Sequence, residues 1–218
     1  TTGGAVIGNP TVLSLCTGQS GTLSAGNAGS SFLWSTGATT QNITVNTAGS
    51  YTVQVTDANG CSASFANSVS VNPIPVPVFT APPVCFGSPT VFTNQSSISS
   101  GSITGNTWFF GNGYSASTVN PTYTYNYTGS YGVTLLVTSS AGCSASVTQN
   151  VTIYQVPNAA FAASTVCQNS SSNYTDQSTA GSGTISTWQW DFGDGSTYSG
   201  QSASHAYATA RSEEHTSE

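Results

Sequence analysis

The stretch from Trp188 to Gly195 (WQWDFGDG) limits the fold of this chain more narrowly than any other feature. Its two aromatic residues Trp190 and Phe192 alternate with a polar one, which is the period-two pattern of a strand with one buried face. Gly193 then interrupts the strand. Asp194-Gly195 is a favoured turn pair, because Asp tolerates a positive φ and Gly adopts one without steric cost. The stretch therefore predicts a half-buried strand that runs into a tight turn.

The two aspartates of this stretch, Asp191 and Asp194, admit two interpretations. In the first, their carboxylates accept hydrogen bonds from backbone amides of the turn. In the second, they bind calcium, because hard cations prefer several oxygen ligands. We favour the structural interpretation, and we expect no metal site and no cofactor.

A second copy of the pattern, Trp108 to Gly113 (WFFGNG), occurs upstream. Beyond the turn, each copy carries two ring-bearing residues at the same offsets from its tryptophan: Tyr123 and Tyr125, or His205 and Tyr207. Agreement over several positions is typical of an internal repeat. The residues of this predicted structural motif are Trp108, Phe110, Gly111, Asn112, Gly113, Trp190, Asp191, Phe192, Gly193, Asp194, Gly195, His205 and Tyr207.

The sequence WDFGDG followed by His205-Ala206-Tyr207 resembles the PKD domain, an immunoglobulin-like β-sandwich abundant in bacterial surface proteins. The resemblance implies an all-β chain of tandem immunoglobulin-like (PKD-type) β-sandwiches. The upstream copy departs from the family pattern, because Phe109, Asn112 and Tyr123 replace the two aspartates and the histidine. A role that needs the carboxylates therefore cannot be general to both copies.

Turn and proline signals divide the chain further. The stretch LWSTGATTQNITVNTAGSYTVQVTDANGC near the N-terminus lacks the FGDG turn and resembles immunoglobulin-like repeats of large adhesins from Bacteroidetes. The expected domains are an immunoglobulin-like repeat (1–72), a proline-rich linker (73–77), a PKD-like domain (78–154), a truncated PKD-like domain (155–210) and a non-native tail (211–218). We call 1–72, 78–154 and 155–210 the first, second and third segments. The third lacks the last strand pair of the second, so we expect it to expose sandwich core and strand edges.

Charged residues are few and unevenly placed. The chain has one Lys or Arg and seven Asp or Glu, and the only Arg and every Glu lie in Arg211 to Glu218. This tail resembles a translated sequencing adapter, and we exclude it from the reasoning. The rest has four Asp and no Lys, Arg or Glu, so we expect no nucleic-acid partner, because phosphate binding needs cations. No apolar run is long enough to cross a bilayer, so we expect no direct membrane insertion.

The five cysteines repeat in position. Cys16, Cys85 and Cys167 each precede an early strand, whereas Cys61 and Cys143 each open a last strand. This placement, without the CxxC spacing of zinc sites, indicates disulfides and an extracellular compartment, secreted or at the cell surface.

Two connectivities are open. Bridges within segments would join Cys16 to Cys61 and Cys85 to Cys143. In an immunoglobulin-like sandwich, however, the two positions lie at opposite ends of the domain, beyond the Cα–Cα reach of a disulfide. Cys16 would then pair with Cys143 of the next segment and link consecutive domains. The odd number of cysteines is expected from truncation of the third segment.

An enzyme is the weakest functional class. His205 is the only His before the tail, so general bases and nucleophile activators are nearly absent. We expect a non-catalytic repeat region that acts as a stalk or adhesion module, with a protein or glycan ligand and neighbouring repeats of the same chain as partners. The alternative is an accessory module, for substrate binding or spacing, of a secreted protease or polysaccharide hydrolase. Tyr123, Tyr125 and Tyr127 are expected to pack in the sandwich, and a sugar-stacking ribbon is the alternative.

Overall fold

The structure, a computed structural model, describes residues 11–26 and 30–208. Within these ranges the chain forms strands, turns and bends and no α-helix, which confirms the predicted all-β fold. Accordingly, none of the described elements is a helix that could cross a membrane. The tail at 211–218 lies outside the described residues, and its origin stays a prediction.

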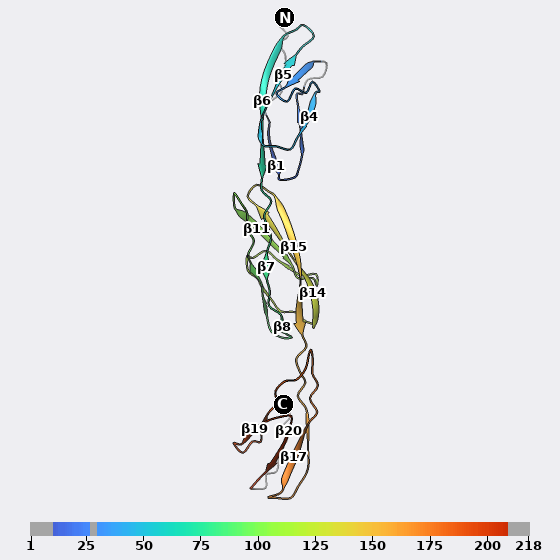
Figure 1. Cartoon of the computed structure of the whole chain (residues 1–218), viewed down its shortest axis with the longest axis vertical. Helices are drawn as coiled ribbons and strands as arrows, with labels where there is room; N and C mark the ends of the chain where they lie inside the picture. The colour runs from blue at the N-terminus through green and yellow to red at the C-terminus, as the bar shows by residue number, and fades with distance from the viewer. Residues whose placement is uncertain (1–10, 27–29, 209–218) are drawn as a thin grey trace. The chain divides into compact units, whose positions relative to one another are not determined.

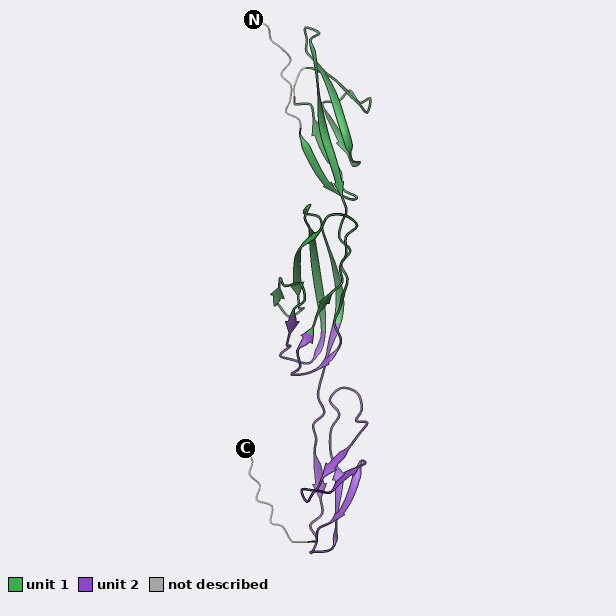
Figure 2. Cartoon of the chain, turned by 90° about the vertical axis from the view of Figure 1, so that its left-hand side faces the viewer, with its two compact units in different colours: residues 1–81, 91–121, 131–150 green, residues 82–90, 122–130, 151–218 purple. Residues whose placement is uncertain are grey.

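The chain divides into two compact units (Figure 2). One unit comprises residues 1–81, 91–121 and 131–150, and the other comprises 82–90, 122–130 and 151–218. We describe the strands of each unit in turn.

The first segment lies in the first unit, and its described residues form six strands. They are β1 (Val12–Cys16), β2 (Gly21–Ser24), β3 (Ser31–Trp34), β4 (Asn42–Val45), β5 (Gly49–Thr56) and β6 (Ser62–Asn72). Figure 1 labels β1, β4, β5 and β6 among them. One sheet has the order β1-β6-β5-β3, and β2 pairs with β4 in a second sheet. The β1–β6 pair is parallel, whereas β5–β6 and β3–β5 are antiparallel.

The core of this segment follows from the period-two pattern. In β5, Val53 and Val55 are buried while their neighbours along the strand are more exposed. Trp34 at the end of β3 is also buried, and its indole N–H donates to the Thr40 carbonyl at 2.9 Å. The buried cluster comprises Leu15, Leu23, Ala25, Trp34, Ile43, Val45, Val53, Val55, Phe65 and Val69.

The next strands belong to the second segment. They are β7 (Phe79–Thr80), β8 (Val84–Cys85), β9 (Thr90–Val91), β10 (Thr93–Asn94), β11 (Ile103–Phe109), β12 (Ser115–Ala116), β13 (Thr122–Tyr123), β14 (Gly129–Ser139) and β15 (Ser144–Tyr154). In the first unit, β11 is antiparallel to both β12 and β14, and Trp108 lies opposite Leu135. In the second unit, β15 runs parallel to β8.

Four aromatic residues of the second segment pack together in the first unit. Trp108 contacts Phe79 edge-on, with ring centroids 5.1 Å apart, and Phe92 lies 5.5 Å from Trp108 and 5.3 Å from Phe110. All four are buried. Such aromatic pairs add to the free energy that the burial of apolar surface already supplies.

The third segment lies in the second unit. Its strands are β16 (Phe161–Ala163), β17 (Ser171–Asp176), β18 (Gln189–Asp191), β19 (Thr197–Ser199) and β20 (Ser202–Ala206). One sheet has the order β16-β17-β20, and β18 pairs with β19. The predicted strand through Trp190 is therefore β18, and the predicted turn joins β18 to β19.

Candidate functional site

The turn after β18 is built by the two aspartates that the sequence singled out. Asp191 Oδ1 accepts a hydrogen bond from the Gly193 amide at 2.9 Å, and Asp194 Oδ1 accepts one from the Ser196 amide at 3.0 Å. The Phe192 amide donates to the Ser196 carbonyl, which closes the loop. Gly193 and Gly195 have φ of 77° and 91°, a region that glycine adopts at little cost. The positions and contacts of both carboxylates agree with their structural interpretation.

Asp194 also holds His205, which reaches the turn from β20. The Nε2 atom of His205 lies 2.7 Å from Asp194 Oδ2, and the Ser196 hydroxyl donates to Asp194 Oδ1. Hydrogen bonds from the Ser196 hydroxyl and amide, and then from His205, stabilise the carboxylate and hold the pKa of Asp194 well below its usual range. The His205 ring stacks on Phe192, with centroids 4.4 Å apart and planes 9° apart.

Ser196, His205 and Asp194 are the residue types of a catalytic triad, but their geometry differs from one. In a triad, the acid holds one ring nitrogen and the serine hydroxyl donates to the other. Here Asp194 contacts Nε2, and Ser196 Oγ lies 3.4 Å from the same nitrogen while its hydroxyl donates to the carboxylate. In this arrangement both the Ser196 hydroxyl and His205 bind the Asp194 carboxylate at the turn.

The described part of the chain contains no cluster of three or more His, Cys, Asp or Glu residues that could hold a metal ion. Moreover, one oxygen each of Asp191 and Asp194 already accepts a turn amide. Hard cations need several such oxygens converging on one point.

The second segment builds the corresponding turn without charge. The Tyr114 amide lies 3.4 Å from Asn112 Oδ1, and Gly111 and Gly113 again have positive φ. Tyr123 and Tyr125 pack edge-to-face at 4.9 Å, as His205 and Tyr207 do at 4.7 Å. The carboxylate–histidine pair is therefore particular to the third segment.

Tyr123, Tyr125 and Tyr127, for which packing and a sugar-stacking ribbon were the alternatives, have different environments. Tyr125 is buried and Tyr123 is half-buried, whereas 78% of Tyr127 is exposed. Burial removes Tyr125 from any sugar-stacking ribbon, and it supports the packing interpretation for that residue.

The tryptophan of each repeat is anchored in the same way. Trp108 Nε1 donates to the Thr118 carbonyl at 3.0 Å, and Trp190 Nε1 donates to the Gly200 carbonyl at 2.8 Å. A buried indole N–H needs such a partner, because an unpaired donor costs about 1–3 kcal/mol.

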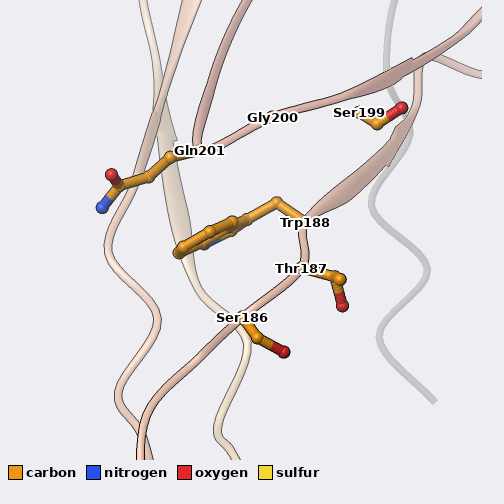
Figure 3. Close-up of a pocket in the computed structure, with 6 residues that line it drawn as sticks. All are labelled: Ser186, Thr187, Trp188, Ser199, Gly200 and Gln201. Atoms are coloured by element: carbon orange, nitrogen blue, oxygen red, sulfur yellow. The ribbon is translucent and has the colours of Figure 1, made fainter.

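A shallow pocket beside Trp188 was not anticipated from the sequence. Its volume is about 330 Å³. Figure 3 shows the Trp188 indole on the same side as Gln201, with the Ser186 and Thr187 hydroxyls pointing away from the ring. The residues that line the pocket are Ser186, Thr187, Trp188, Ser199, Gly200 and Gln201.

Trp188 is oriented by Asp176 at the end of β17. The indole Nε1 donates to Asp176 Oδ2 at 2.7 Å, and the Ser178 amide donates to Asp176 Oδ1 at 2.9 Å. Hydrogen bonds from Ser178 first, and from Trp188 after it, outweigh desolvation and lower the pKa of Asp176. In the second segment, Asn94 and Asn106 make the equivalent contact at 2.7 Å. The WQW spacing was the available signal for Trp188, since it places a second ring two residues before Trp190.

The cysteines resolve the two connectivities. Cys16 at the end of β1 forms a disulfide with Cys143 in the turn between β14 and β15, with Cα atoms 5.7 Å apart. The bridges within segments, Cys16–Cys61 and Cys85–Cys143, are therefore not formed. Cys61, Cys85 and Cys167 are exposed free thiols. The disulfide in the structure is therefore the one that links the first segment to the second.

The chain is similar to known PKD domains. A family model described as PKD domain matches residues 70–155 and 154–210. The PKD1 domain of Vibrio anguillarum Epp is 29% identical, with 38% of this chain and 95% of that chain covered and a TM-score of 0.35. The PKD1 domain of the Vibrio cholerae metalloprotease PrtV is 36% identical, with coverages of 37% and 96% and a TM-score of 0.34. No curated protein matches the chain.

Proposed function

This chain belongs to the PKD domain family, and on that premise we propose that it is a non-catalytic stalk or adhesion region of a cell-surface or secreted protein. In this proposal the three segments are consecutive domains, Pro73 to Pro77 is a short linker, and each domain supports its neighbour. Their polar, weakly charged surfaces contact protein or glycan ligands.

The observation that carries the proposal is the Cys16–Cys143 disulfide. Proline restricts the backbone of 73–77 but leaves the flanking segments able to pivot. A covalent bond between the first and second segments adds a second connection and removes much of that freedom. In the same place, the Cys143 sulfur lies 3.9 Å from the carbonyl of Asn72, the last residue of β6. A junction of this kind suits a chain that must transmit force or hold a binding domain away from a surface.

Two further features support the proposal. Disulfides persist in oxidising compartments, which favours an extracellular location. The His205 cluster is arranged to fix a turn, so the residues closest in type to a catalytic set have a structural explanation.

The proposal is tested by comparing Cys16→Ser with Cys61→Ser in oxidised protein by small-angle X-ray scattering. We expect Cys16→Ser to broaden the distribution of interatomic distances, because the junction loses one of its two connections. The control Cys61→Ser removes an exposed free thiol and should leave the distribution unchanged. Identical curves for wild type and Cys16→Ser would contradict a mechanical role for the bridge.

A second candidate, an accessory module that binds polysaccharide for a secreted hydrolase, is favoured by the pocket at Trp188. Half-buried aromatic rings offer a flat apolar face that sugars stack on. We expect Trp188→Ala to abolish retention on insoluble chitin or cellulose if this candidate holds, and Tyr127→Ala, at an exposed ring of the second segment, to retain it. Equal binding by wild type and Trp188→Ala would contradict the polysaccharide-binding role proposed for the pocket.

A further inference from the structure

The third segment repeats the aromatic core of the second but leaves it open. Residues 82 positions apart (190 minus 108) correspond, so Phe161, Tyr174, Trp190 and Phe192 match Phe79, Phe92, Trp108 and Phe110. The ring arrangement is the same: Phe161 meets Trp190 edge-on at 5.5 Å, as Phe79 meets Trp108 at 5.1 Å. The burial is not the same. Trp108 is fully buried and Trp190 is not, and 60% of Phe161 is exposed where Phe79 is 2% exposed.

The strand edges beside this core are open as well. In the second segment, β11 is flanked by β12 and β14, and β8 pairs with β15. In the third, β18 pairs with β19 alone among the strands described, and Val166 and Cys167, which correspond to β8, form no strand. The free edge of β18 and the Val166–Cys167 segment therefore lie where the second segment places the hairpin β14–β15.

Two equivalent glycines, Gly111 and Gly193, show the same difference between the second and third segments. A Cβ added to Gly111 would lie 2.8 Å from the carbonyl oxygen of Gly132 in β14. The corresponding Gly193 has a similar φ, yet a Cβ there would meet nothing within 4 Å. The backbone approach that glycine permits in the second segment has no counterpart in the third.

The uncovered core lines a large groove. Its volume is about 1300 Å³, and Phe161, Tyr174, Trp190 and Phe192 contribute to its lining. Pockets for small molecules are typically about 300–1,000 Å³ and are closed around their ligand. A groove bordered by the free edge of β18 and by the Val166–Cys167 segment suits an extended polypeptide, because strand addition pairs backbone amides and carbonyls that otherwise face solvent.

The environment of Cys85 is a second observation that bears on what binds in the groove. The turn after it repeats that after Cys16: the Ser88 amide donates to the Cys85 carbonyl at 3.1 Å, and the Gln19 amide donates to the Cys16 carbonyl at 2.9 Å. Each cysteine also ends a strand that is parallel to the last strand of its segment. Cys16 is bonded to the β14–β15 turn of the following segment, whereas Cys85 is an exposed free thiol.

We propose that the groove of the third segment is a docking site for a β-hairpin of the type found at Gly129 to Tyr154, with a cysteine at its turn that bonds to Cys85. Strands of the hairpin would pair with β18 and with the Val166–Cys167 edge, and its alternating apolar residues would cover Trp190. Formation of the disulfide removes two protons and two electrons from the two thiols. A small disulfide such as oxidised glutathione accepts them and becomes two thiols.

The test adds a synthetic peptide with the sequence of Gly129 to Tyr154 to the full chain in a glutathione redox buffer. We expect saturable binding at a ratio of one to one, a blue shift of tryptophan fluorescence, and a mixed disulfide between the peptide and Cys85 rather than Cys61 or Cys167. With Cys85→Ser, the cross-link is lost while non-covalent binding remains. This design does not depend on the stalk role, because it reports on the groove alone.

A control peptide carries Leu135→Asp and Val137→Asp and keeps its cysteine. We expect its binding to be weaker by more than about tenfold, because buried carboxylates would be unpaired. Equal binding of both peptides, or equal cross-linking to the three free cysteines, would overturn the proposal. Binding of an oligosaccharide in the groove that the peptide cannot displace would also overturn it.

A fusion protein provides the same test if the peptide is insoluble. In this protein the sequence of Gly129 to Tyr154 replaces Arg211 to Glu218. Gly129 follows Tyr125 by the number of residues by which Arg211 follows Tyr207, so the register is preserved. The fused hairpin should protect the Cys85 thiol from maleimide and raise the melting temperature. Full reactivity of Cys85 in oxidised fusion protein would contradict the proposal.

Discussion

Asp194 determines how the third segment responds to acid. Its carboxylate accepts the Ser196 hydroxyl and amide and contacts His205, and these bonds lower its pKa in the folded state. A group whose folded pKa lies below its unfolded value stabilises the fold above the unfolded pKa, and that contribution is lost as pH falls through the folded pKa. The unfolded value for Asp is about 3.9.

We therefore predict that the third segment loses stability as pH falls below about 4, and that Asp194→Asn reduces this loss. Melting followed by tryptophan fluorescence between pH 6 and pH 2 measures the effect. Ser196→Ala should also flatten the profile, because the Ser196 hydroxyl contributes most to the lowered pKa. If the wild type and Asp194→Asn lose stability in parallel, Asp194 has no such role.

The second and third segments differ in how the turn after the tryptophan strand packs against a neighbouring strand. Gly111 and Gly193 occupy equivalent turn positions with φ of 79° and 77°. An L-residue in this region costs roughly 1–2 kcal/mol at either position. Only Gly111 lies against another backbone, because β14 passes over it.

We predict that Gly111→Ala lowers the free energy of unfolding of the second segment by about 2–5 kcal/mol, of which overpacking contributes about 1–3. Gly193→Ala should cost the third segment about 1–2 kcal/mol, the backbone contribution alone. Urea unfolding of the two variants, followed by near-ultraviolet circular dichroism, compares them. Equal losses would contradict the difference in packing.

Local patterns predicted the elements well, because period-two alternation and Gly or Asp turn pairs act over a few residues. Trp190 and the two aspartates lie where these patterns placed them, whereas β18 ends at Asp191, one residue before Phe192. The pocket at Trp188 depends on the contact between Trp188 and Asp176, which lie 12 residues apart in the sequence. In the second segment the equivalent contact joins two asparagines, Asn94 and Asn106. The disulfide likewise depends on how strands are ordered in the sheets, and spacing alone left two connectivities open.

We propose that, at the scale of the whole molecule, the chain is a series of repeats joined by more than a peptide linker. Consecutive segments share a sequence frame, and the first and second are joined by a disulfide between residues 127 positions apart. Cys61 occupies the position equivalent to Cys143, and Cys85 occupies the position equivalent to Cys16. Cys143 and Cys16 are bonded to each other, whereas Cys61 and Cys85 are free thiols. The covalent junction is the central claim, since both the proposed stalk and the proposed hairpin site extend it.

The most direct test is a non-reducing peptide map of the oxidised chain after free thiols have been alkylated. Chymotrypsin suits the digest, because the chain has a single Arg and no Lys, while aromatic residues separate Cys16 from Cys61 and Cys85 from Cys143. We predict one disulfide-linked pair containing Cys16 and Cys143, with alkylated Cys61, Cys85 and Cys167. A linked peptide containing Cys16 and Cys61, or Cys85 and Cys143, would contradict the account.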